Sequence, residues 1–393
     1  MNKRIAIISP GNLPIPAIHG GAVESLVDTF LRYVGMMTNF NVDVYSVSED
    51  ITSELIRQNG NIKYIQVPKI NQNRKIDNII RRFRPQQNFS YYIKYVCSKL
   101  ESNDYDIVIV ENRPTFIYDI SKATKAKVFL HLHNENFVSV KKYCRYVPKY
   151  CEKIIVVSEY IKGVVERNMY NANNVTVLYN GIDGNKFRKE SDKSIIKRVR
   201  AKYGIRYEDT VICYTGRFSP EKGVKEVVEA YSRLNDLSNL VLLIIGSSWF
   251  GANSENNYIN TVQKISTNCS NRIVFTGYIK NEDVAKIESV SDIAILPSLW
   301  NDPLPLTVIE AMASELPVIT TIAGGIPEMC TCDTGILLQN NDALAESIEM
   351  AIRKLIIDTD LRIKLGKNGR ERVDSRFTAE CYSRNFINIL LNE

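Results

Sequence analysis

The sequence predicts an α/β protein of two domains, each built on a parallel β-sheet, that face each other across a cleft. Short runs of β-forming residues alternate with helical patterns along the chain, which is typical of βαβ units. Several runs are apolar on both faces, such as Ile-Ala-Ile-Ile at 5–8 and Leu-Leu-Ile-Ile at 242–245, as buried parallel strands are. A polar, turn-rich stretch at 180–193 separates two series of these runs.

The first predicted helix follows the first predicted strand. One face of it is apolar, formed by Val23, Leu26, Val27, Phe30, Leu31 and Val34. The strands predicted in the first series are 4–9, 42–46, 106–110, 127–131, 153–158 and 175–179. Those predicted in the second series are 211–215, 240–245, 272–276, 292–296 and 318–321.

Two domains and a terminal helix account for the whole chain. We place the first domain at 1–185, the second at 186–375 and a C-terminal helix at 376–393. An apolar stripe marks that helix, made of Tyr382, Phe386, Ile389 and Leu390. We therefore expect the helix to cross back and pack on the first domain.

Charge is distributed unevenly between the two domains. The chain carries 50 Lys and Arg against 44 Asp and Glu, a net charge of +6. Residues 1–180 contain 24 basic and 16 acidic side chains, a net charge of +8, whereas the remainder has a net charge of −2. The first domain is therefore expected to lie near something negative.

Targeting and cysteine patterns favour the cytoplasm. The apolar run at the N-terminus stops at Pro10, and no stretch reaches the roughly 20 apolar residues that span a bilayer. The eight Cys include no C-x-x-C pair. Free, structural thiols in a reducing compartment are expected, without a metal site.

In each series, a glycine-containing loop follows the first strand. Gly20-Gly21-Ala22 opens the first helix, where glycine lets a ligand approach the backbone and free N–H groups attract anions. Its spacing is not that of a dinucleotide fingerprint, and an ordinary loop-to-helix turn is the alternative. Gly216 to Gly223 follows strand 211–215 and carries Arg217 and Lys222. Two cations at the carboxyl end of a parallel strand favour binding of a diphosphate, although surface loops often carry such residues.

A third segment follows strand 292–296. Pro305 suits the first position of a helix, so the helix is expected to open around Leu306 and Thr307. The bare N–H groups there offer a second phosphate site. Glu310, one turn into that helix, would accept hydrogen bonds from paired hydroxyls, and Asp302 would reach a polyhydroxy group.

The order and spacing of these motifs resemble the family 4 retaining glycosyltransferases of bacterial surface-polysaccharide type, which have the GT-B fold of two Rossmann-like domains. The resemblance covers nearly the whole chain. Besides the loops above, its marks are Val157-Ser158-Glu159, Asn180-Gly181-Ile182-Asp183, Pro297-Ser298, Glu310-Ala311-Met312, Pro317-Val318-Ile319 and Gly324-Gly325-Ile326-Pro327-Glu328.

This resemblance implies a nucleotide-sugar donor site in the second domain. The family's E-x7-E pattern places Glu310 on the nucleotide ribose and Asp302, here in place of Glu, on the donor sugar; Pro305 stands where the family usually has Gly. Arg217 and Lys222 would hold the diphosphate. The implied donor-binding set is Gly21, Gly216, Arg217, Lys222, Leu306, Thr307 and Glu310. The implied catalytic set is His133, Arg217, Lys222 and Asp302.

The histidines have two further interpretations. His131 and His133 lie on one face of a strand at its carboxyl end. A metal pair is conceivable, but no third ligand is spaced nearby, and buried structural histidines are the usual case. The resemblance favours His133 as the cleft histidine beside the reacting sugar, with His131 second. A D-x-D at 104–106 precedes a strand at its amino end, so we interpret it as a solvated turn.

Basic and aromatic residues are interleaved in two segments of the first domain. The residues assigned to an acceptor or membrane face are Arg81, Arg82, Arg84, Lys141, Lys142 and Arg145. A solvated basic face is one interpretation. Anionic lipid is the other, because each Lys or Arg near such a surface contributes roughly 1 kcal/mol. Nothing resembles a nucleic-acid-binding motif.

The resemblance, with the residues above, therefore implies a metal-independent hexosyl- or N-acetylhexosaminyltransferase with no cofactor. It would move a sugar from a nucleotide diphosphate donor, with UDP favoured, to a lipid-linked or glycan acceptor. Its expected location is cytoplasmic and peripheral, at the inner face of the cell membrane. The alternatives are a UDP-sugar epimerase of the same fold and a catalytically silent sugar-nucleotide-binding partner protein.

Overall fold

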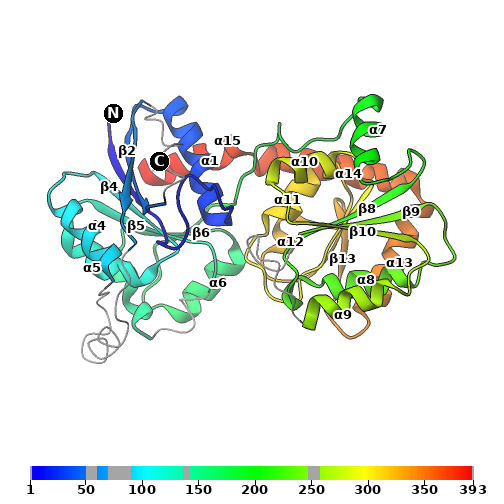
Figure 1. The fold of residues 1–393 in the computed structure, drawn as a ribbon. Coiled ribbons are helices and arrows are strands. Elements are labelled where there is room, and N and C mark those ends of the chain that lie inside the picture. The colour runs from blue at the N-terminus through cyan, green and yellow to red at the C-terminus, as the bar shows by residue number, and fades with distance from the viewer. Residues whose placement is uncertain (1, 50–59, 70–89, 136–141, 247–256, 392–393) are drawn as a thin grey trace. The chain divides into compact units, whose positions relative to one another are not determined.

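The computed structural model describes residues 2–49, 60–69, 90–135, 142–246 and 257–391. The chain forms two compact units (Figure 1). Unit 1 comprises Met1–Gly181 and Ala379–Glu393, and unit 2 comprises Ile182–Thr378. None of the helices in the described ranges is long and apolar enough to span a membrane.

Unit 1 is built on a seven-stranded parallel sheet with the strand order β3-β2-β1-β4-β5-β6-β7. Its strands are β1 (Arg4–Ile8), β2 (Asn41–Val47), β3 (Ile62–Val67), β4 (Ile107–Glu111), β5 (Lys127–Leu132), β6 (Lys153–Val156) and β7 (Val175–Val177). Its helices are α1 (Ala22–Met37), α4 (Tyr91–Glu101), η1 (Pro114–Phe116), α5 (Ile117–Ala123), η2 (Lys142–Tyr150), α6 (Glu159–Asn168) and α15 (Ala379–Leu391). The central strands are buried on both faces, as their apolar sequences predict.

The C-terminal helix α15 packs on α1 within unit 1. The rings of Phe386 and Phe30 lie 4.8 Å apart, and Phe386 also lies 5.2 Å from the ring of His131 at the end of β5. The buried stripe contains Ile387, whereas the predicted Ile389 is only half-buried. The helix presents two adjacent rows of side chains to unit 1, so the contact is wider than a single stripe.

Unit 2 is built on a six-stranded parallel sheet with the order β10-β9-β8-β11-β12-β13. Its strands are β8 (Thr210–Thr215), β9 (Leu240–Ile245), β10 (Arg272–Gly277), β11 (Ile293–Leu296), β12 (Val318–Thr321) and β13 (Gly335–Leu338). Its helices are α7 (Lys193–Lys202), η3 (Pro220–Lys222), α8 (Val224–Ser232), α9 (Asn257–Ser266), α10 (Asn281–Ser289), α11 (Leu306–Ala313), α12 (Ile326–Met329), α13 (Leu344–Ile357) and α14 (Thr359–Arg376). Figure 1 shows α8, α9 and α13 on one face of this sheet and α10, α11 and α14 on the other.

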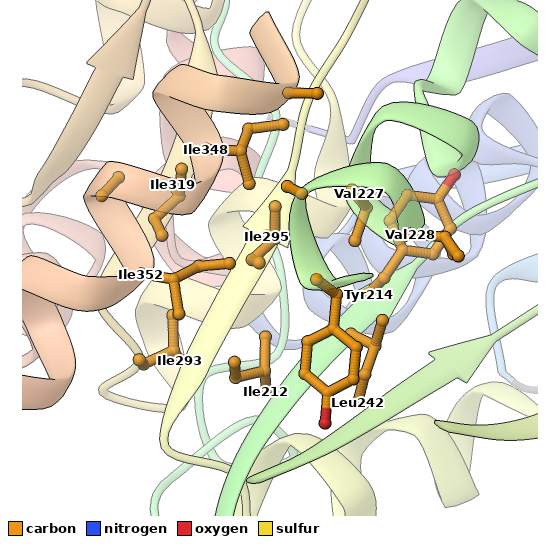
Figure 2. Close-up of a cluster of buried hydrophobic side chains, with 14 of the residues drawn as sticks. Ile212, Tyr214, Val227, Val228, Leu242, Ile293, Ile295, Ile319, Ile348 and Ile352 are labelled. Carbon is orange, nitrogen blue, oxygen red and sulfur yellow. The ribbon is translucent and has the colours of Figure 1, made fainter. Parts of the chain in front are cut away.

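A hydrophobic core fills the face of the unit 2 sheet beneath α8 and α13. Figure 2 shows Ile212 and Tyr214 of β8 beside Ile295 of β11, opposite Val227 of α8 and Ile348 of α13. Residues 212 and 214 point into this core, so Cys213 and Thr215 point to the opposite face, toward α10 and α11.

The sequence prediction misses two strands, β3 and β13. Both lie at an edge of their sheet, and each has several half-buried residues. The other two edge strands, β7 and β10, were predicted, so edge position is not the reason: Lys63 and Gln66 interrupt the apolar run of β3, and β13 is a short strand that begins at a glycine.

Both sheets reverse their strand order beside the first strand of the unit. The reversal lies between β1 and β4 in unit 1 and between β8 and β11 in unit 2. Open parallel sheets bind ligands at the carboxyl ends of strands at such a switch point. The topology thus singles out the loops after β1 and β4, and those after β8 and β11.

Replacement of Ile295 by Ala tests the core of unit 2. Ile295 is fully buried, so the substitution should lower the free energy of unfolding of unit 2 by about 3 kcal/mol, through lost apolar contact and the cavity left behind. Urea unfolding measures the change. The control is Ile363→Ala at a position 49% exposed in the same unit, where the loss should be small. Equal losses for the two variants would contradict the placement of this core.

Candidate functional site

The switch point of unit 2 contains a pocket at the carboxyl ends of β8 and β11. Three residues predicted to act on the donor line it: Lys222, Asp302 and Thr307. Thr215, Ser298 and Pro305 also contribute to its wall. The other predicted donor residues of this unit, Gly216, Arg217, Leu306 and Glu310, lie beside the pocket in sequence but do not line it.

An ion pair joins the two loops of the pocket. The Lys222 ammonium, at the end of η3, donates to the Asp302 carboxylate at 2.5 Å. Lys222 also lies 5.8 Å from the centre of the Trp300 ring. The Asp302 side chain is 8% exposed and that of Lys222 is 22% exposed, so the pair is largely removed from water. The cation predicted for the diphosphate and the carboxylate predicted for the sugar therefore contact each other directly.

The backbone around Asp302 is held by a close contact with Gly324. The Asp302 carbonyl accepts a hydrogen bond from the N–H of Gly325 at 2.8 Å. A Cβ on residue 324 would lie only 2.1 Å from that carbonyl oxygen, and Gly324 has a φ of 54°. Only glycine satisfies both conditions, so this residue fixes where the Asp302 loop runs.

Helix α11 begins at Leu306, as predicted, but Pro305 has a different place. Pro305 is the N-cap residue, with extended backbone, and is not the first helical residue. The φ of Pro305, −68°, is the value to which the proline ring restricts the backbone. The N–H that proline lacks is also not needed here, because a backbone N–H at the start of a helix has no partner within the helix. Thr307 thus lies in the first turn, and Glu310 is buried one turn into the helix.

The Tyr214 hydroxyl hydrogen-bonds to the backbone of the loop after β8. The Tyr214 hydroxyl lies 3.2 Å from the carbonyl of Arg217 and 3.1 Å from that of Lys222, so it can donate to either. These contacts hold the backbone of the loop both before η3 and at its last residue. Arg217 itself is half-buried.

A buried acid that the sequence analysis did not identify lies behind this pocket. Glu288, in the last turn of α10, is 1% exposed, and its Oε1 accepts a hydrogen bond from the Thr215 hydroxyl at 3.1 Å. Burial, and next the negative charge of Glu310, raise the pKa of Glu288 well above its usual value. The only feature of the sequence that could have identified Glu288 is that a carboxylate stands at a helix position where an apolar residue is expected.

In unit 1, three buried polar side chains meet at the ends of β4 and β5. The Glu111 carboxylate is 2.8 Å from Nε2 of His133 and 3.1 Å from Nδ1 of His131. The register pairs Glu111 with His131 on adjacent strands. The backbone N–H of His133 donates to the side chain of Asn112 at 3.1 Å. The expectation that no third ligand lies near the two histidines was wrong, because the third group comes from the neighbouring strand.

The electrostatics of this Glu111–His131–His133 cluster favour a carboxylate between histidines. Burial alone would raise the pKa of Glu111, but the charge and hydrogen bonds of His131 and then His133 outweigh it and lower the pKa to about 2. Burial and the neighbouring His131 lower the pKa of His133 to about 4. The His133 side chain is 6% exposed and directed at Glu111.

The same three residues are a possible metal-binding set. Their ligand atoms lie within 4.8 Å of one another, and two histidines with a carboxylate suit Zn²⁺ or Fe²⁺. Histidine ligands usually donate their other ring N–H to a second group. Here Nε2 of His131 and Nδ1 of His133 are buried and make no hydrogen bond to any part of the chain that the structure describes. Direct hydrogen bonding to Glu111 therefore fits the cluster better than a metal.

Gly21, at the start of α1, is covered by an acidic side chain. Gly21 is the N-cap residue, with a φ of 104°, and a Cβ there would lie 2.3 Å from Oε2 of Glu24. Glu24 is 5% exposed, and burial is the largest of the effects that raise its pKa to about 7. The sequence analysis did not identify this carboxyl group.

The predicted basic face is only partly described. Arg81, Arg82, Arg84 and Lys141 lie outside the described residues, as does the side chain of Lys142. Arg145 is exposed, with its guanidinium 5.9 Å from the ring centre of Tyr170. Lys149 is exposed, and Tyr146 and Tyr170 are 49% and 53% exposed.

The D-x-D at 104–106 lies at the amino end of β4. Its second aspartate, Asp106, accepts a hydrogen bond from the backbone N–H of Arg4 at 2.8 Å.

Comparison with known proteins identifies both halves of the chain. Residues 29–186 match Glycosyltransferase Family 4, and residues 195–372 match Glycosyl transferases group 1. A Bacillus subtilis (strain 168) protein named as a glycosyltransferase, YtcC, is 30% identical over 95% of this chain and 88% of its own length. The capsular polysaccharide biosynthesis glycosyltransferase CapM of Staphylococcus aureus is 32% identical over 58% of each chain. The crystal structure of Anabaena Alr3699/HepE in complex with UDP-glucose has a TM-score of 0.78 at 19% identity, covering all of both chains. This likeness confirms the predicted fold, two Rossmann-like domains of the GT-B type.

The buried acid Glu288 should make unit 2 less stable as the pH rises. Its pKa is raised in the folded state, so its full contribution is present below its unfolded pKa of about 4.5 and is lost as the pH rises toward the folded value. Besides burial, the groups acting on it are Glu310 from α11, whose negative charge raises the pKa, and the Thr215 hydroxyl from β8, whose hydrogen bond lowers it. Glu288→Gln should remove a slope of up to about 1.4 kcal/mol per pH unit.

Urea unfolding of unit 2 between about pH 5 and pH 8 measures this slope. Glu346→Gln, an exposed change on α13, is the matched control and should leave the slope unaltered. An identical pH dependence in wild type and Glu288→Gln would mean that Glu288 is ionised in the folded protein.

Proposed function

Because this chain belongs to the family 4, group 1 glycosyltransferases, we propose that it moves a sugar from a nucleotide diphosphate donor to a lipid-linked or glycan acceptor, with retention of anomeric configuration. The favoured donor is a UDP-hexose or UDP-N-acetylhexosamine. The proposed role is cell-surface polysaccharide synthesis. The word capsular in the name of the S. aureus relative, and UDP-glucose in the complex with a similarly folded protein, support these choices.

One observation carries the proposal: a cation, a carboxylate and a helix start meet in the pocket at the switch point of unit 2. Lys222 and Asp302 come from the two loops, and Thr307 from the first turn of α11. Lys222, with Arg217 on the same loop, would bind the diphosphate, and the N–H groups of α11 would add to this. Glu310 would accept hydrogen bonds from the ribose.

The Lys222–Asp302 pair gives this site a specific chemistry. An ammonium has three donors, so Lys222 can bond a phosphate oxygen while it stays near Asp302. Asp302 then becomes an acceptor for hydroxyls of the donor sugar. As the bond to the anomeric carbon breaks, Lys222 and Arg217 stabilise the negative charge that develops on the leaving diphosphate. The acceptor hydroxyl would be held by unit 1, with His133 beside the sugar, so positioning supplies much of the rest.

The transfer is proposed to need no metal or cofactor, since Arg217 and Lys222 supply the positive charge that a metal would give. Activity that survives exhaustive chelation would agree with this. Loss of activity on chelation, restored by Zn²⁺ or Fe²⁺, would assign a metal to the reaction. Metal analysis of Glu111→Gln would then test whether the Glu111–His131–His133 cluster holds it.

Removal of the donor contacts should abolish turnover. Arg217→Ala should lower the rate of nucleotide release by about 100-fold or more, the loss expected for a group that stabilises the transition state, and Glu310→Ala should lower the rate at limiting donor through lost ribose binding. The assay incubates purified protein with a panel of nucleotide sugars and membrane lipid extract. Arg233→Ala, an exposed cation at the end of α8, is the control and should keep full activity.

The outcomes of this assay separate the proposed reaction from its alternatives. Release of nucleotide from no donor, with or without acceptor, would point to a silent sugar-nucleotide-binding protein. Conversion of a UDP-sugar to its epimer without acceptor would point to an epimerase. Full activity in both variants would mean that the donor site lies elsewhere.

We further propose that the protein acts at the inner face of the cell membrane as a peripheral protein. The exposed residues Arg145, Lys149, Tyr146 and Tyr170 support this, because cations attract anionic headgroups and tyrosine rings settle at the membrane interface.

Binding to anionic liposomes should depend on these cations. Replacement of both Arg145 and Lys149 by Ala should weaken co-sedimentation by up to about 2 kcal/mol, and added salt should weaken it further. The matched control replaces Arg233 and Lys264, two cations of unit 2, and should have little effect. Equal binding of wild type to neutral liposomes would contradict the proposal.

A further inference from the structure

The end of β4 holds both the side chain and the backbone of His133. Nε2 of His133 lies 2.8 Å from Oε2 of Glu111, the last residue of β4. The next residue, Asn112, accepts a hydrogen bond from the His133 backbone N–H at 3.1 Å. The backbone N–H of Asn112 in turn donates to the His131 carbonyl at 2.7 Å. Two successive residues of one loop therefore fix a histidine that lies just past the end of β5.

One oxygen of Glu111 serves both histidines. Nδ1 of His131 lies 3.1 Å from the same Oε2 that faces His133. A protonated carboxyl oxygen could donate to only one of these nitrogens, whereas a carboxylate oxygen accepts from both. Glu111 is 1% exposed, and two donors also compensate its buried charge. The Glu111 carboxylate thus places one proton on Nδ1 of His131 and one on Nε2 of His133.

The other ring nitrogen of His133 is left without a partner. Nδ1 is buried and makes no hydrogen bond within the part of the chain that the structure describes. When the proton is on Nε2, Nδ1 of a neutral imidazole carries a lone pair and is an acceptor. A buried acceptor without a donor is costly, so a hydroxyl that donates to Nδ1 would be bound favourably.

His131 supports this arrangement from inside the sheet. It lies within β5 and is 0% exposed, whereas the His133 side chain is 6% exposed. Its ring centre lies 4.1 Å from that of His133 and 5.2 Å from that of Phe386 in α15. His131 therefore holds Glu111 in place, and His133 is the histidine nearer to the edge of the sheet.

We propose that Glu111 is a positioning residue for His133: it holds the tautomer with the proton on Nε2, so that Nδ1 accepts a hydrogen bond from a hydroxyl of the sugar substrate. The inference rests on the proposed function, which gives His133 its place beside the sugar. It also names a substrate class, a sugar with an uncharged hydroxyl at this position. A bare nitrogen offers no hydrogen bond to a carboxylate there.

The first test determines which nitrogen of His133 carries the proton. The chain has three histidines, so isotope-labelled histidine gives a simple two-bond proton–nitrogen NMR spectrum, and His133→Phe assigns the signals. Wild type should carry the proton on Nε2. Glu111→Gln should keep this tautomer, because the amide oxygen can replace Oε2 as the acceptor. Glu111→Leu should lose the preference, so the form with the proton on Nδ1 appears.

Two further variants support this measurement. His131→Phe keeps a ring beside Phe386 and leaves the Glu111 carboxylate facing His133, so it is the control and should retain the wild-type tautomer of His133. If Glu111→Leu does not fold, Glu111→Asn takes its place, since its side chain is one methylene too short to reach His133.

The second test asks whether Nδ1 selects a hydroxyl. It measures kcat/KM for UDP-glucose and its monodeoxy derivatives, with membrane lipid extract as the source of acceptor. In wild type, one derivative should lose about tenfold or more, because its binding leaves a buried acceptor unpaired. In His133→Phe this loss should fall to within about threefold, which identifies the hydroxyl. Glu111→Leu should behave like His133→Phe, and Glu111→Gln like wild type.

The inference is overturned if wild-type His133 carries its proton on Nδ1 or on both nitrogens, or if Glu111→Leu leaves the tautomer unchanged. A metal ion bound by the three side chains would also overturn it. Equal loss of kcat/KM for every sugar in Glu111→Leu, as a merely structural role would cause, contradicts the selection of a hydroxyl. A wild type that turns over no UDP-sugar would overturn the proposed donor, while the NMR spectrum still decides the role of Glu111.

Discussion

The position of the first strand in each parallel sheet is the constraint on which the rest of this structure depends. β1 lies between β2 and β4, and β8 lies between β9 and β11. Hydrogen-bonded parallel strands end at the same edge of the sheet, so their following loops lie side by side. In unit 2 this brings the Gly216–Gly223 loop against the Asp302 loop. In unit 1 it brings Glu111 against the histidines of the next strand.

Burial decides how the charges at these edges behave. A charge removed from water needs a partner, and two buried groups at these edges have one from a different strand or loop. Lys222 has Asp302, and Glu111 has two histidines. Glu288 accepts a hydrogen bond from a hydroxyl, and burial, with the charge of Glu310, raises its pKa well above the usual value. The site is thus a set of pre-formed pairs, and a ligand has to exchange partners with them.

Strand positions in the centres of the sheets followed directly from the sequence. β9 and β12 were predicted to the residue, and β1 and β8 to within one, because the apolar run in each strand stops at polar residues, glycine or proline. β3 and β13 were missed because polar residues interrupt the apolar run of β3 and because β13 is short and begins at a glycine. The loops with Lys222 and Asp302 were likewise identified, since they follow recognisable strands and carry Gly or Pro at the turn.

The sequence by itself determined the α/β class, the two series of strands and the order of the loops that carry polar residues. These features are local: hydrophobic periodicity, glycine and proline act on their immediate neighbours. Only the tertiary structure decided the partners. Glu111 meets His133 across 22 residues of chain, Glu288 meets Thr215 across 73, and Lys222 meets Asp302 across 80. Such contacts depend on which strands pair and in which register, and no spacing along the chain specifies that.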